Sequence, residues 1–90
     1  MTRFMALAFD IVTARGITLH EEELDRIVVR RREAAYDPGS EVAICPHHGP
    51  LLMQTQACDA RLTRHGRTWT VHAEPGVLEV LDDLATLIVT

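Results

Sequence analysis

The chain has 90 residues, of which 47% are hydrophobic and 24% are charged. This length and composition fit one compact domain over residues 1–90, and they exclude a disordered chain or a second core. The formal net charge of −4 argues against a general nucleic-acid binder. Two cysteines are too few for a disulfide framework, and the first apolar segment is too short to span a bilayer. We therefore expect a cytoplasmic protein with reduced thiols and no membrane contact.

Residues 3–36 predict a helical hairpin. Apolar side chains recur at helical spacing over residues 3–15, and Gly16 stands where the C-terminal cap of a helix belongs. Thr18 and Glu21 match a capping box, in which the hydroxyl takes a free backbone N–H of the first turn and the carboxylate reaches back. The run that follows carries a second apolar stripe at helical spacing.

A small antiparallel β-ribbon is expected over residues 41–73, after the turn signal Asp37-Pro-Gly-Ser40. The last run alternates and is rich in β-formers, so that Trp69 lies on one face and His72 on the other. The strand candidates are Val42–Cys45, Leu51–Thr55, Ala60–His65 and Arg67–Ala73.

A final helix is predicted over residues 75–89. Pro75 suits the first turn of a helix, and the acidic side chains of the run fall on its polar side. The apolar stripe consists of Leu78, Leu81, Leu84, Ala85 and Ile88. The expected fold class is therefore α+β, with an N-terminal helical hairpin, a small central antiparallel β-ribbon with a zinc-knuckle-like turn, and a C-terminal helix.

The stretch CPHHGP at residues 45–50 suggests a structural zinc site. Cys45 and His48 offer a thiolate and an imidazole on one tight turn, and zinc binds such groups at tetrahedral positions. This turn resembles the knuckles of zinc-ribbon proteins, which use Cys-Pro-x-Cys-Gly; here His48 replaces the second cysteine. The expected ligands are Cys45, His48, Cys58 and His65, with His47 and His72 as alternates. A plain Cys/His loop without metal is the competing interpretation.

The leading functional hypothesis is a small non-enzymatic binding protein that zinc stabilises. Zinc would replace missing core, because binding energy in a structural site is also folding energy. Its partner would be another protein or a second copy of the chain. No catalytic residue is assigned.

Two alternatives stay open at this point. Arg61, Arg64 and Arg67 could contact phosphates while Trp69 stacks on a base, although burial of Trp69 in a core short of aromatics is favoured. The second alternative is a metal-free protein with a reactive thiol on one of the two cysteines, activated by a nearby histidine.

Overall fold

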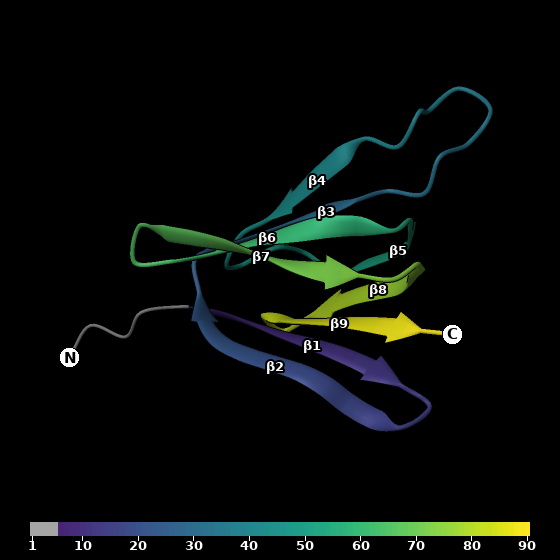
Figure 1. Cartoon of the computed structure of the whole chain (residues 1–90). Helices are drawn as coiled ribbons and strands as arrows, with labels where there is room; N and C mark the ends of the chain where they lie inside the picture. Colours follow the sequence, from purple (N-terminus) through teal and green to yellow (C-terminus); the bar gives the residue numbers. More distant parts are fainter. Residues whose placement is uncertain (1–5) are drawn as a thin grey trace.

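The computed structural model describes residues 6–90, and every regular element in that range is a β-strand (Figure 1). The strands are β1 (Leu7–Thr13), β2 (Gly16–Leu24), β3 (Arg26–Arg30), β4 (Glu41–Ile44), β5 (Leu51–Thr55), β6 (Cys58–Arg64), β7 (Arg67–Ala73), β8 (Gly76–Leu81) and β9 (Leu84–Val89). The described part of the chain has no helix long and apolar enough to cross a membrane.

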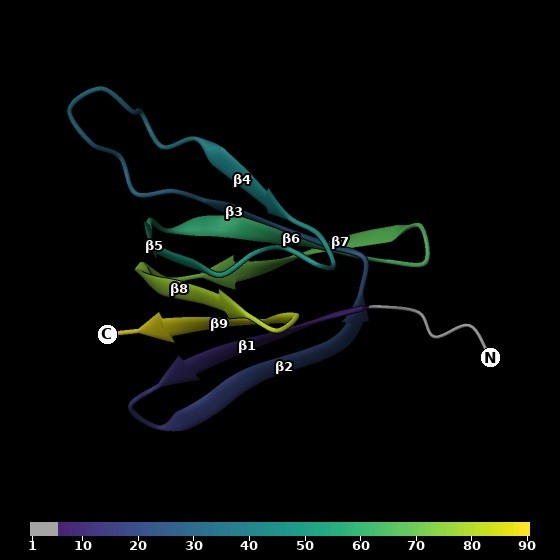
Figure 2. The ribbon, with the colours of Figure 1, turned by 180° about the vertical axis from the view of Figure 1, so that it is seen from behind.

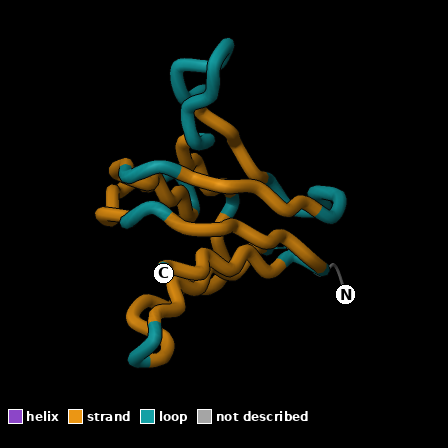
Figure 3. Tube along the Cα trace, turned by 90° about the vertical axis from the view of Figure 1, so that its right-hand side faces the viewer, coloured by secondary structure: helices purple, strands orange, loops and turns teal. Residues whose placement is uncertain are grey.

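The strands form two sheets that lie face to face (Figures 1 and 3). Sheet A has the order β2-β1-β9-β8-β5, and sheet B has the order β4-β3-β6-β7. Their inner faces share one apolar layer, and each fully buried aliphatic or aromatic side chain there contributes about 1.5–3 kcal/mol. The largest fully buried side chains are Phe9, Leu7, Leu24, Ile27, Ile44, Leu62, Leu78, Leu87 and Val80.

Strand β1 occupies the interior of sheet A, between β2 and β9. It pairs with β2 through an antiparallel hairpin and with β9 in parallel, so that Phe9 lies beside Ala85. The remaining ladders between named strands are antiparallel. The chain then leaves sheet A at Leu24 and enters sheet B at Arg26, with both flanking side chains Leu24 and Ile27 fully buried.

Residues 31–40, here called the arm, project beyond the sandwich between β3 and β4 (Figure 2). The predicted turn at Asp37-Pro-Gly-Ser40 is present: the Asp37 carboxylate accepts hydrogen bonds from the backbone N–H groups of Gly39 (2.9 Å) and Ser40 (3.0 Å). The base of the arm also reaches sheet A, because the Arg32 N–H donates to the Gln54 carbonyl at 3.0 Å.

The predicted helical hairpin over residues 3–36 is wrong. Within the described range this segment forms β1, β2 and β3, while residues 3–5 lie outside that range. The buried residues of β1 alternate as Leu7, Phe9 and Ile11, which is the period of a strand. The apolar Ala8 and Val12 on the opposite face filled the gaps and produced an apparent helical stripe. Gly16 is a hairpin residue with φ 106° instead of a helix cap.

The predicted C-terminal helix over residues 75–89 is also wrong, because this segment forms the β8–β9 hairpin. Asp82 and Asp83 join the two strands with φ values of 50° and 62°. Two consecutive residues with positive φ form the turn whose twist suits a two-residue hairpin. Leu78 and Val80 face the core, whereas Leu81 is exposed.

The central segment contains the predicted strands but does not form one ribbon. Strands β6 and β7 make the expected hairpin, in which Leu62 pairs with Trp69 on the inner side. Strand β4 joins them through β3 in sheet B, while β5 belongs to sheet A. The predicted ribbon is thus divided between the two layers.

We predict that Gly76→Ala destabilises the sandwich. A Cβ atom at Gly76 would collide with the backbone carbonyl of Ile88, which the neighbouring strand cannot move without breaking the ladder. Such overpacking typically costs about 1–3 kcal/mol, which urea unfolding would measure. Gly49→Ala is the matched control, because a Cβ atom at Gly49 meets nothing within 4 Å. Equal stability of the two variants would contradict the close approach of β8 and β9.

Candidate functional site

The two outer faces of the sandwich differ in chemistry. Among the described residues, five of the six large hydrophobic side chains that are exposed belong to strands of sheet A, and the sixth is Tyr36 in the arm. The five are Ile17, Leu52, Leu81, Leu84 and Ile88. Strand alternation points four of them away from the core, and a register shift in the β1–β2 ladder pairs the fifth, Ile17, with Val12 on the same outer face. The outer face of sheet A therefore leaves apolar side chains in water.

Cross-strand pairing gathers these side chains into stripes. Val12 of β1 pairs with Ile17 of β2 on one side and with Ile88 of β9 on the other, and Ile88 pairs with Val77 of β8. Directly paired residues lie about 4.5–5.5 Å apart, so this stripe is continuous across four strands. Ile17 and Ile88 are its exposed members, at 63% and 45%.

A second, shorter apolar stripe lies at the other end of the same strands. Ala8 pairs with Leu84, and Leu84 pairs with Leu81 across the β8–β9 hairpin. Ala8 lies four positions before Val12 on β1, which corresponds to about 13 Å along a strand.

An acidic stripe runs between the two apolar stripes. Asp10 pairs with His20 and Thr86, and Thr86 pairs with Glu79. None of the five strands of sheet A contains Lys or Arg, whereas the strands of sheet B contain Arg26, Arg30, Arg61, Arg64 and Arg67. The outer face of sheet A is therefore apolar and acidic, without a strand-borne cation other than protonated His20.

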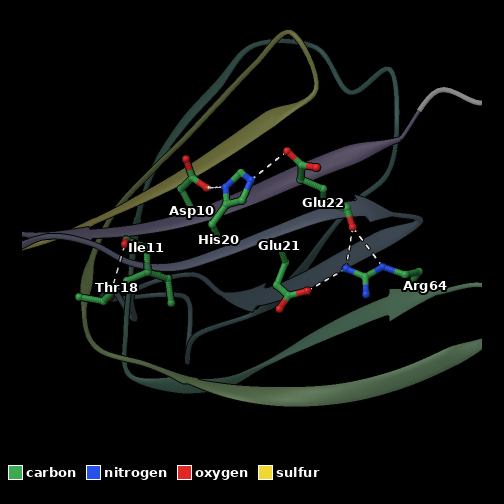
Figure 4. Close-up of polar contacts among 7 residues, drawn as sticks. All are labelled: Asp10, Ile11, Thr18, His20, Glu21, Glu22 and Arg64. Carbon is green, nitrogen blue, oxygen red and sulfur yellow. Dashed lines mark hydrogen bonds and ion pairs between the residues drawn. The ribbon is translucent and has the colours of Figure 1, made fainter.

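His20 lies between two carboxylates on this face (Figure 4). Its Nδ1 contacts Asp10 Oδ1, and its Nε2 contacts Glu22 Oε1 at 2.9 Å. Carboxylate oxygens only accept hydrogen bonds, and both ring nitrogens donate only in the imidazolium form. The geometry thus matches a protonated ring. The hydrogen bonds of Asp10 and then of Glu22 raise the pKa of His20 above its ordinary value of 6.5.

The same residue pattern recurs on sheet B in a looser form. His72 Nδ1 lies 3.7 Å from Asp59 Oδ1 on the paired strand, and its Nε2 lies 3.1 Å from Glu74 Oε1. This cluster provides an internal comparison for His20, because the two histidines have equivalent neighbours on faces of different chemistry.

The predicted zinc ligands start from separate parts of the fold. Cys45 and His48 belong to the turn after β4, where the His48 N–H donates to the Cys45 carbonyl at 3.2 Å. Cys58 is the first residue of β6 and His65 follows its last residue, so the two lie about 20 Å apart along the strand direction. The alternate His72 lies toward the Cys58 end, since it pairs with Asp59.

Neither cysteine forms a disulfide: Cys45 is exposed, and Cys58 is half-buried against the core. Within residues 6–90, no three His, Cys, Asp or Glu side chains form a group that could hold a metal ion. The other alternate, His47, is exposed and its backbone N–H donates to Asp83 Oδ1 at 2.7 Å. The zinc site stays a sequence-based prediction.

Two of the three arginines of the nucleic-acid hypothesis form ion pairs within the protein. Arg61 forms an ion pair with Glu41 at 2.6 Å on the outer face of sheet B. Arg64 pairs with Glu21 at 2.7 Å and stacks over the ring of Trp69, 5.1 Å from its centroid. Trp69 itself packs against the core, and the fourth member, Arg67, is exposed at the start of β7. Arg64, Arg67 and Trp69 line one shallow pocket together with Glu21, whereas Arg61 is not part of it.

Sequence reasoning missed the outer face of sheet A because four of its five strands, all except β5, fall in segments predicted as helices. One signal was present in the sequence: the five segments that form sheet A hold no Lys or Arg, although the chain has nine. The sequence matches no protein-family model and no curated protein.

His20 should stabilise the fold in mildly acidic solution. A raised pKa means that the folded chain binds this proton more tightly than the unfolded chain. The stabilisation is fully present below the unfolded value of 6.5 and is lost as the pH rises through the folded pKa. The free energies of unfolding of the wild type and His20→Gln, measured in urea, should therefore differ at acid pH and become equal at alkaline pH. An NMR titration of His20 with a midpoint at or below 6.5 would contradict the arrangement.

We predict that His47→Gly stabilises the protein. His47 follows Pro46 in a four-residue turn and has a φ of 65°, a conformation that a non-glycine residue adopts only at a cost. Glycine relieves this strain but loses more backbone entropy on folding than histidine does. The net effect should be a rise in the free energy of unfolding of up to about 1 kcal/mol. Thermal unfolding should show a melting temperature higher by about 4–8 °C per kcal/mol. His48→Gly, at a residue without positive φ, is the control and should lower the stability.

Proposed function

We propose that this chain is a non-enzymatic docking protein that binds a partner protein through the outer face of sheet A. The observation that carries the proposal is the concentration of exposed large hydrophobic side chains on this one face. Scattered single apolar residues are normal on a protein surface, but a contiguous group marks a contact region. Ile17, Val12, Ile88 and Val77 are contiguous by strand pairing.

The size of the face supports a protein partner. Five strands spaced about 4.8 Å apart, each contributing about five residues, form a face of about 400 Å². The largest contiguous apolar patch on a typical monomeric protein measures roughly 300–600 Å² and is often functional. The face is broad and striped, a shape suited to another protein surface.

Charge supports the choice of partner class. An acidic face without Lys or Arg in its strands repels the phosphates of nucleic acid, and two of the arginines of sheet B are already paired with acids. The unpaired cysteines are in keeping with a reducing cytoplasmic location.

The test compares two double variants in binding to an identified partner. Photo-crosslinking from position Thr86, at the centre of the face, in an extract of the source cells would identify the partner, which is then purified. Ile17→Thr with Ile88→Thr keeps β-forming residues and removes two exposed isoleucines from the stripe. Each lost isoleucine contact is worth about 1 kcal/mol or more, so Kd should rise at least about tenfold.

The matched control changes the opposite face of the sandwich. Thr68→Ser with Thr70→Ser alters two exposed residues of β7 and should leave Kd unchanged. Equal binding by both double variants would overturn the proposal. So would an Ile88-dependent dimer in sedimentation of the protein alone, since the face would then be covered by a second copy.

A further inference from the structure

His20 lies on the outer face of sheet A, where a bound partner would sense the charge of its ring. The stripe that contains His20 lies between the two apolar stripes, so a partner that covers both also covers Asp10 and Thr86 and lies next to His20 on the paired edge strand. Asp10 and Glu22 contact the ring directly, and Glu79 belongs to the same stripe beyond Thr86. The Asp10 side chain is only 15% exposed, whereas that of His20 is 50% exposed.

Protonation of His20 changes what the cluster offers to a partner. With the imidazolium present, one positive charge lies between Asp10 and Glu22 and occupies an oxygen of each carboxylate. With the neutral ring, only one nitrogen can donate, so one carboxylate loses its partner and the cluster carries one more unit of negative charge. A cationic side chain of a partner gains from this second state.

We propose that the partner of this face presents Lys or Arg between apolar side chains, and that loss of the proton from His20 strengthens its docking. This inference rests on the proposed function and specifies its partner. Charge complementarity selects the cation, because the strands of sheet A carry acids and no Lys or Arg. The two apolar stripes favour apolar side chains on either side of the partner's cation. The protonated histidine competes with the partner's cation for the same two carboxylates.

The experiment uses two synthetic probes of defined chemistry and the full isotope-labelled chain. One probe is an amphipathic peptide of leucine and lysine, and the other has glutamate in place of each lysine. Amide shifts are followed by NMR at one pH below and one above the titration of His20. The lysine peptide should move the amides of Val12, Thr86 and Ile88, and the glutamate peptide should not. Lysine does not titrate in this range, so a pH effect originates in the protein.

The affinity for the lysine peptide should rise about fivefold between the two pH values, which is the lower end of the usual coupling between sites. His20→Gln should bind with the higher affinity at both pH values, because its side chain cannot carry the competing charge. His72→Gln is the matched control: it removes the equivalent histidine from sheet B and should retain the pH effect.

The outcomes separate the two proposals. Absence of shifts on the outer face of sheet A with either peptide would overturn the docking function itself. Binding of both peptides alike, or binding of the lysine peptide without a pH effect, would overturn only the inference about partner charge and His20. Loss of the pH effect in His72→Gln would assign it to the wrong histidine and would equally overturn the inference.

Discussion

The parallel pairing of β1 with β9 is the constraint on which the rest of the structure depends. It inserts the first described strand between β2 and the last strand, and so it completes the interior of sheet A. Phe9 and Leu87 are thereby brought into the same apolar layer. On the opposite side the same ladder places Val12 against Ile88 and Asp10 against Thr86. Core and outer face are thus products of one set of backbone hydrogen bonds, and a shift of one residue would exchange their side chains.

Apolar residues on both faces of β1, β8 and β9 explain why these strands of sheet A were mistaken for helices. A strand with one wet face shows alternation, but β8 and β9 carry apolar residues on both faces. Leu81 and Ile88 filled the positions where a polar residue would have marked a strand, and together with the core residues they imitated a helical stripe. The property that hid the sheet from sequence reasoning is the same property that marks its outer face as a contact surface.

Other parts of the structure were accessible from the sequence. Sheet B has a polar outer face, so alternation in β7 was plain, and Trp69 was expected to pack against the core. The turn at Asp37 was also correct because its signal is local: one carboxylate satisfies the following N–H groups. The candidate site could not be predicted from the sequence, because it is formed by pairings between distant segments, such as Asp10 with Thr86 and Val12 with Ile88. No spacing along the chain encodes these neighbours.

The hydrogen bonds at the base of the arm also determine how the sandwich avoids aggregation. An unpaired edge strand offers free N–H and C=O groups to any other chain, and an apolar edge is the most hazardous. Strand β5, with the exposed Leu52, is such an edge. Two backbone hydrogen bonds cover part of it: the Arg32 N–H donates to the Gln54 carbonyl, and the Gln56 N–H donates to the Arg30 carbonyl. The opposite edge, β2, is protected differently, by the charges of Glu21–Glu23. Both edges of sheet A are thereby less open to backbone pairing with an extended chain, while the apolar side chains of the broad face stay available to a matching side-chain surface.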